Sequence, residues 1–163
     1  MYFVSIEYIA GFCDGEASLC ISNHKVHDKR HDITYTSLQA TLEISNTNLQ
    51  ILEEIKDFFN AKSKIFQTNK ARLVEAKAWQ RRGNGKWKPC YVLCIYGFAL
   101  IPVLERLLPF LRVKHERAEL VLKFLQIRLD QYGGKYRPGV TMPYANELFE
   151  IQKQITLLNR RGA

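Results

Sequence analysis

The chain has 163 residues, of which 47% are apolar and 25% are charged, and these proportions are those of a globular domain. They exclude a disordered tail, a collagen-like rod and a low-complexity linker, and no apolar run approaches the roughly 18 residues of a membrane-spanning helix. The N-terminal segment contains Glu7 and Asp14 and no basic start, so we expect neither a signal nor a transit peptide. We expect a single intracellular domain over 1–163, in a prokaryotic cytoplasm or an organelle.

The net charge of +8 is concentrated in one segment. Between Lys62 and Lys88 there are nine Lys or Arg residues and a single acid, Glu75, whereas the rest of the chain holds fifteen basic and fifteen acidic residues. The same segment carries both tryptophans, Trp79 and Trp87. A concentrated basic segment is typical of proteins that bind a polyanion. The charge pattern therefore indicates a nucleic-acid partner, and the alternative is an ordinary solvated surface.

The cysteines and histidines do not have the pattern of a zinc site. Cys90 and Cys94 lie on a strand-like run, where four residues span about 13 Å, which is too far for one ion. His24, His27 and His31 flank a charged turn and lack a paired C-x-x-C. Reduced cysteines that fill semi-buried positions are the better interpretation.

The first predicted elements are a helix and two strands. Ser5 can cap a helix that begins at Ile6 and buries an apolar face including Ile9 and Cys13. The pattern then changes to the alternation of a strand, first around Leu19 and again over 38–44, with one polar face each. We expect the charged segment 24–32 between these strands to be a hairpin loop.

The same order of elements then repeats. Asn46 or Thr47 can cap a helix whose apolar positions run over 49–59. A third strand begins at Lys64, and a long basic hairpin leads back to a fourth strand over 91–96. Helices follow over 97–108, 114–130 and 143–159.

These elements predict an α+β fold with the order αββαββα and two further helices. Four strands with one polar face each form an antiparallel sheet, and the helices can cover its apolar face. The core then covers about 2–130, and 131–163 is a C-terminal helical extension. The open face, polar and joined to a basic hairpin, fits the major groove of DNA.

The segment 9–17, IAGFCDGEA, has two features that an ordinary helix does not need. Gly11 lies in the middle of the predicted helix, where glycine costs about 1 kcal/mol relative to alanine. Asp14 and Glu16 lie at its C-terminal end, where the helix dipole disfavours negative charge by roughly 0.3–1 kcal/mol. Acids at this end indicate a compensating cation, and the alternative is a capped, solvated helix end.

This segment resembles the LAGLIDADG motif of homing endonucleases, and 108–114, LPFLRVK, resembles the stretch that delivers the family's active-site lysine. The order αββαββα is the family's core architecture, with a saddle-shaped four-stranded sheet. One copy of the motif is present, and family members with one copy are homodimers. The resemblance implies a site-specific endonuclease, encoded by a mobile intron, that cleaves a long pseudo-palindromic DNA target by Mg²⁺-dependent phosphodiester hydrolysis. Mn²⁺ or Ca²⁺ can replace Mg²⁺ for binding.

Two alternatives share this fold. One is a maturase that assists the splicing of its host intron RNA, and the other is a DNA-binding protein that has lost nuclease activity. Retention of Glu16 and Lys114 favours the endonuclease, because a protein that only binds nucleic acid does not require them.

The resemblance also assigns catalytic roles. Glu16 and the Gly15 carbonyl would hold Mg²⁺, Lys114 would stabilise charge in the transition state, and Asn46 would orient the attacking water. Gln50 stands where family members often carry a basic or polar helper. Glu16 in place of the usual Asp and Gln50 in place of Arg are departures from the family pattern. The alternatives are a helix cap for Asn46, a helix-surface position for Gln50 and a helix start for Lys114.

The expected dimer interface is a stripe with small residues at its middle, which lets two helices approach closely. Its members are Glu7, Ala10, Gly11 and Asp14.

Residues that alternate away from the core are expected to contact DNA. On the first hairpin they are Ser22, His24, Lys25, Gln39, Thr41 and Glu43. On the second hairpin they are Lys64, Phe66, Thr68, Lys70 and Arg72. Near its tip, the residues expected to hold phosphates are Lys77, Arg81, Arg82, Lys86 and Lys88.

Overall fold

The computed structural model describes residues 4–62, 72–75, 91–132 and 145–160. The first half contains α1 (Ile6–Glu16), β1 (Ala17–Asp28), β2 (Ile33–Asn46) and α2 (Leu49–Lys62). The second half contains β3 (Arg72–Glu75), β4 (Tyr91–Tyr96), α3 (Leu100–Leu107), α4 (His115–Tyr132) and α5 (Ala145–Arg160). Short 3₁₀ turns precede and follow α3. The order αββαββα with additional helices is confirmed.

The four strands form one antiparallel sheet in the order β1-β2-β4-β3. Ala17 of β1 lies opposite Ile44 of β2, and Ile44 lies opposite Leu93 of β4. Because side chains alternate along a strand, this register places the apolar residues of three strands on one face. The residues buried on that face are Ala17, Leu19, Ile21, Leu38, Ala40, Leu42, Ile44, Leu93 and Ile95.

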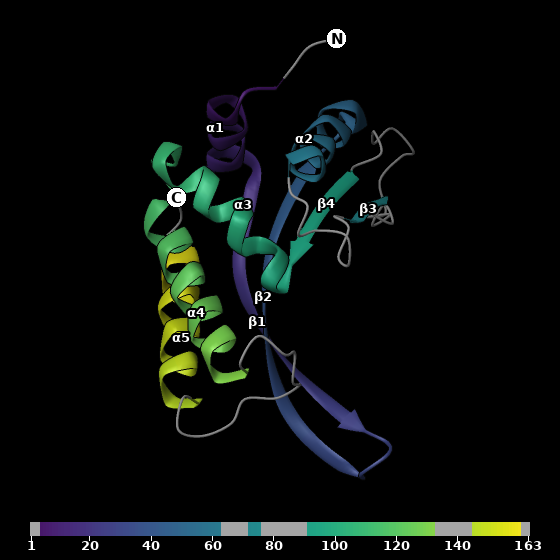
Figure 1. Cartoon of the computed structure of the whole chain (residues 1–163), viewed down its shortest axis with the longest axis vertical. Coiled ribbons are helices and arrows are strands. Elements are labelled where there is room, and N and C mark those ends of the chain that lie inside the picture. Colours follow the sequence, from purple (N-terminus) through teal and green to yellow (C-terminus); the bar gives the residue numbers. More distant parts are fainter. Residues whose placement is uncertain (1–3, 63–71, 76–90, 133–144, 161–163) are drawn as a thin grey trace.

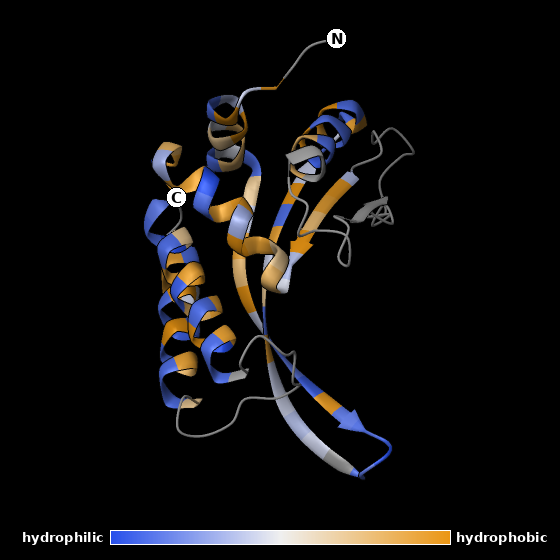
Figure 2. Ribbon diagram, viewed as in Figure 1, coloured by the Kyte–Doolittle hydropathy of each residue, from blue (hydrophilic) through white to orange (hydrophobic). Residues whose placement is uncertain are grey.

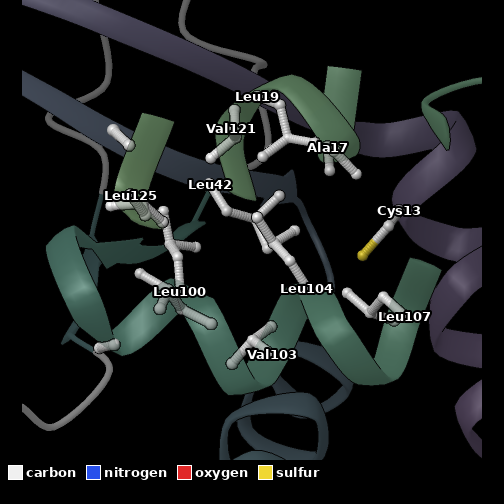
Figure 3. Close-up of a cluster of buried hydrophobic side chains, with 14 of the residues drawn as sticks. Cys13, Ala17, Leu19, Leu42, Leu100, Val103, Leu104, Leu107, Val121 and Leu125 are labelled. Carbon is white, nitrogen blue, oxygen red and sulfur yellow. The ribbon is translucent and has the colours of Figure 1, made fainter. Parts of the chain in front are cut away.

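The core forms between this apolar face and the helices. α3 contributes Leu100, Val103, Leu104 and Leu107, whose spacing places them on one side of a helix. Figure 3 shows these side chains next to Leu19, Leu42 and residues of α4. Orange, apolar segments accordingly line the inner sides of the helices and the body of the sheet in Figure 2.

α5 closes the edge of the sheet at β1. Its buried residues Leu148, Ile151 and Ile155 face the body of the protein, and the Asn159 side-chain amide donates to the carbonyl of Leu19 on β1 at 3.0 Å. Figure 1 shows α5 beside α4. The last predicted helix is therefore confirmed, beginning at Ala145, while Pro143 lies outside the described residues.

The expectation of a loop over 24–32 is wrong for its first half. β1 and β2 remain paired to Asp28 and Ile33, and the hairpin projects well beyond the helices (Figure 1). His27 and Thr34, directly opposite each other, share a side-chain hydrogen bond of 3.2 Å. Backbone pairing and such cross-strand contacts extend the hairpin through its charged residues, where the hydropathy pattern predicts a loop.

The N-terminal cap of α1 is the predicted residue, whereas the cap of α2 is a different one. The Ser5 hydroxyl accepts the N–H of Tyr8 at 3.2 Å, which confirms the cap of α1. For α2 the cap is Asn48, whose side chain accepts the N–H of Gln50 at 3.1 Å. Asn46 instead accepts the N–H of Asn48 at 2.8 Å and so forms the turn that leads into the helix.

Other expectations are partly covered by the described residues. The start of the third strand at Lys64 lies outside them, and the strand is seen at Arg72–Glu75.

Cys13, Cys20 and Cys94 are free thiols, and burial raises the pKa of Cys13 to about 12. Within the described ranges no helix is long and apolar enough to cross a bilayer.

The position of the core predicts that substitutions on the two faces of the sheet change the free energy of unfolding by different amounts. Leu42→Ala removes a side chain that is 1% exposed and should lower the free energy of unfolding by about 2–5 kcal/mol, measured by urea denaturation. Ser45→Ala, at an exposed position of the same strand, should change it by less than about 0.5 kcal/mol. Equal effects of the two substitutions would contradict the assignment of faces.

Candidate active site and nucleic-acid interface

The C-terminal end of α1 is the centre of the candidate site. Glu16 is the last residue of the helix and is exposed, and β1 begins immediately after it. The last carbonyl groups of a helix lack partners within the helix, and they carry its negative dipole end. Gly15 belongs to this last turn, so its carbonyl and the Glu16 carboxylate present oxygen atoms at an electronegative surface.

Asp14 connects this end of α1 to the start of α4. Its carboxylate oxygens accept the backbone N–H groups of Arg112 at 2.8 Å and Lys114 at 3.0 Å. Burial raises the pKa of Asp14, but the N–H groups of Arg112, Lys114 and Val113, together with the charge of Lys114, outweigh it and hold the pKa below its ordinary value. The carboxylate is thus kept ionised and fixed in place.

Lys114 is the cation that the acids of α1 require. Its side chain is 5% exposed, and its ammonium group donates to the backbone carbonyl of Asp14. Burial lowers the pKa of Lys114, an effect that the negative charges of Asp14 and Glu16 partly offset and the positive charge of Arg117 increases. The interaction with Glu16 places the two predicted catalytic groups within electrostatic range of each other.

The oxygen donors at this end of α1 suit a divalent cation such as Mg²⁺, which takes carboxylate and carbonyl oxygens and retains several waters. One chain supplies few of these donors. Among the described residues there is no group of three or more His, Cys, Asp or Glu side chains that could hold a metal ion. The Glu16 carboxylate and the Gly15 carbonyl are oxygen donors of the kind that such an ion takes.

Asn46 and Gln50 lie at the same end of the sheet as Glu16. Ala17 pairs with Ile44, and Asn46 follows two residues later at the end of β2. Figure 1 shows α1 and α2 at this end of the sheet. The Gln50 side chain donates to Glu54 of its own helix at 3.0 Å, so it is held along the surface of α2. The roles of both residues stay predictions.

The expected interface stripe needs one correction. Ala10 is fully buried in the core of its own chain, because it follows Ile9 and precedes Cys13 on the side of α1 that faces α3. It therefore has no surface to offer to a partner. Glu7 and Gly11 are exposed and Asp14 is partly so, as expected.

The exposed side of α1 also carries aromatic residues that the sequence argument missed. Tyr8 is 51% exposed and stacks on Phe12 with ring centroids 6.1 Å apart. A Cβ atom added at Gly11 or Gly15 would have open space around it. The four-residue spacing of Tyr8 and Phe12, next to Gly11, was the signal that could have identified this surface.

The sheet face opposite the core is polar. Ser22, Gln39, Thr41 and Glu43 alternate with buried residues and lie on this face. His24 joins them and shares a 2.8 Å hydrogen bond with the Ser22 hydroxyl. Further residues of this face were missed, although the same alternation includes them, among them Ser18, Cys20, Cys94 and Tyr96.

Of the remaining predicted DNA contacts, two lie within the described residues. Lys25 is exposed, but it alternates with His24 and so points to the other side of the hairpin. Arg72 of β3 is in register with Cys94 of β4, which pairs with Glu43, so it lies in the same row of the sheet as Glu43. The others lie outside the described residues, namely Lys64, Phe66, Thr68, Lys70, Lys77, Arg81, Arg82, Lys86 and Lys88.

Comparisons with known proteins agree with this geometry. Residues 9–81 match the family model described as LAGLIDADG endonuclease. That segment contains most of α1, the first hairpin, α2 and β3. A sequence search of curated proteins gave no match.

Solved structures with the same fold include several homing endonucleases. I-CvuI, solved with a target DNA in the presence of Mg²⁺ and with the DNA not cleaved, is 18% identical with a TM-score of 0.68, over 94% of this chain and 80% of that one. The archaeal intron-encoded I-Vdi141I, complexed with DNA, is 20% identical with a TM-score of 0.68, over 97% and 86%. I-LtrWI, bound to target DNA, is 14% identical with a TM-score of 0.67, over 94% of this chain but 45% of the other.

The Asp14 contacts predict an acid-dependent contribution to stability. Because the pKa of Asp14 is lowered by folding, its contribution is present above the unfolded pKa of about 3.9 and is lost as the pH falls through the folded pKa. Asp14→Asn should therefore lower the free energy of unfolding by about 1 kcal/mol at neutral pH, since charged hydrogen bonds contribute roughly 1.5–3 kcal/mol and partial exposure reduces this.

Urea denaturation without divalent ions tests this expectation from neutral pH to below pH 3. The difference between the wild-type chain and Asp14→Asn should shrink as the pH falls. Asp57→Asn, at an exposed position of α2, is the matched control. A difference of the same size at every pH would show that the ionised carboxylate is not responsible.

Proposed function

This chain belongs to the LAGLIDADG endonuclease family, and from that premise we propose that it cuts double-stranded DNA as a homodimer with the help of a divalent metal ion. The observation that carries the proposal is the arrangement at the end of α1. An exposed Glu16 lies within electrostatic range of the buried Lys114, which Asp14 holds in place. This group adjoins the end of an open, polar sheet face.

The surface of α1 supports the homodimer. The exposed side of α1 combines Gly11 and Gly15, which have open space above them, with the Tyr8–Phe12 pair. Such a surface lets two symmetry-related helices approach closely across a dyad.

The dyad would complete the metal site. Two α1 helices that meet along this side bring their C-terminal ends together, and with them two Glu16 carboxylates. Close carboxylates repel each other unless a cation lies between or beside them. We propose that Glu16 and the Gly15 carbonyl hold Mg²⁺, with the scissile phosphate and water as further ligands. When bound, the ion activates water and neutralises charge on the phosphate.

The other residues act on the substrate or on each other. Lys114 would stabilise the negative charge that develops on the phosphate, at a position fixed by its hydrogen bond to Asp14. Asn46 would orient the attacking water from the end of β2. The open sheet face would lie in the major groove, with the basic segment 62–88 holding phosphates.

Glu16→Gln separates cleavage from binding. The amide keeps the shape of the side chain but loses the charge that holds the metal, so we expect no cleavage and unchanged binding. The probe is the set of duplexes that the wild-type protein retains from a random DNA pool in Ca²⁺, afterwards supplied with Mg²⁺. Glu53→Gln, an exposed acid on α2, should cut like the wild type. If Glu16→Gln cuts at the wild-type rate, the assignment of Glu16 as a catalytic residue fails. If the wild-type protein binds DNA without cutting it, the alternative of a DNA-binding protein that has lost nuclease activity is supported instead.

Gly11→Leu tests the dimer because it should stabilise the folded chain and at the same time prevent dimerisation. A Cβ added at Gly11 has open space around it, and replacing glycine within a helix stabilises it by about 1 kcal/mol. We therefore expect a folded chain that no longer dimerises, measured by sedimentation and thermal unfolding. Glu53→Leu adds the same side chain to an exposed site on α2 and should leave the dimer intact. A Gly11→Leu protein that remains dimeric would contradict a seam along this helix.

A further inference from the structure

The open sheet face is built as a series of cross-strand pairs that begins beside the catalytic end of α1. Ser18 faces Glu43, Cys20 faces Thr41, and Ser22 faces Gln39. β4 extends the first two pairs with Cys94 and Tyr96. Each step along the series moves two residues away from Glu16, so position along the strands corresponds to distance from the site of cleavage.

Glu43 differs chemically from the rest of this face. It is exposed, and its backbone neighbours across the strands are Ser18 and Cys94, which are uncharged. Burial raises the pKa of Cys20, and the charge of Glu43 raises it further, so the thiol in the adjacent pair stays neutral. Among the open-face residues of β1, β2 and β4 just described, Glu43 is the one carboxylate.

A carboxylate on a DNA-binding surface is unfavourable unless it meets a hydrogen-bond donor, because phosphates repel it. In the major groove the donors are the amino groups of cytosine and adenine. Adenine presents the N7 acceptor beside its amino group, which would repel a carboxylate, whereas cytosine presents N4 without an acceptor of its own. Glu43 therefore suits cytosine.

We propose that Glu43 specifies a cytosine in each half of the DNA target, at a base pair close to the cleaved phosphates. The inference rests on the proposed function, because it requires that the open face lies in the major groove. It goes further by assigning one base to one residue and by ordering the others along the target.

The spacing of the sheet fixes that order. Four residues separate Glu43 from Gln39, which is about 13 Å along a strand, and base pairs in duplex DNA rise about 3.4 Å each. Gln39 should therefore act about four base pairs farther from the centre of the target than Glu43. Its half-buried side chain lies beside Ser22, whose hydroxyl donates to the Gln39 carbonyl at 3.3 Å.

The test is selection of duplexes from a random DNA pool in Ca²⁺, followed by sequencing of what each protein retains. Four full-length proteins are compared, namely the wild type, Glu43→Gln, Gln39→Ala and the matched control Glu53→Gln. We expect the wild type to prefer cytosine at one position per half-site by about 10-fold or more. Glu43→Gln should lose that preference and keep the others, and Glu53→Gln should keep them all.

The two hypotheses fail in different ways. If Glu43→Gln and Glu43→Ala, both folded by thermal unfolding, keep the wild-type preference at every position, the inference about Glu43 is wrong and the proposed function stands. A wild-type protein that retains DNA without base preference also overturns the inference alone. A wild-type protein that retains no DNA overturns both. Gln39→Ala should change a preference about four base pairs outward, and a change nearer the centre would refute the ordering.

Discussion

The carboxylate of Asp14 joins two parts of the chain that are about a hundred residues apart. It accepts N–H groups from Arg112 and Lys114, and so fixes the end of α1 against the start of α4. The Lys114 ammonium donates in turn to the backbone carbonyl of Asp14, so the main chain and the side chain of Lys114 are both tied to the last turn of α1. The negative end of the helix dipole, two acids and one buried lysine are then a single electrostatic unit. Its parts are stable together because each compensates the charge of another.

This unit was partly visible in the sequence. Acids at the C-terminal end of a predicted helix indicated a compensating cation, and Lys114 is that cation. The backbone N–H groups that bind Asp14 could not be predicted, because they depend on how a turn after α3 approaches α1 in space. The same applies to Ala10. Its small size suggested a helix seam, but a small residue suits a tightly packed core equally well, and only the packing of α1 on α3 decides between them.

Local sequence patterns predicted which helices and strands form better than they predicted where these elements begin and end. Strict alternation over 38–44 identified β2, and Ser5 identified the start of α1, because each depends on neighbouring residues alone. The hairpin beyond Ser22 is rich in polar and charged residues, so hydropathy did not show that its strands continue. Three polar residues precede α2, and Asn46, Thr47 and Asn48 are all chemically able to cap it. Backbone geometry selects Asn48 and gives Asn46 a separate hydrogen bond.

The position of α5 has a consequence for how the edge of the sheet is protected against aggregation. β1 is an outer strand of the sheet, and an exposed outer strand offers free backbone groups to which another chain can add. Asn159 occupies one of these groups, the carbonyl of Leu19, and Arg117 of α4 donates to the carbonyl of Leu158 at 3.0 Å, which holds the end of α5 in place. The final helix thus covers part of this outer strand and hinders the addition of a further strand there. The carbonyl of Leu19 is then no longer available to a strand of another chain.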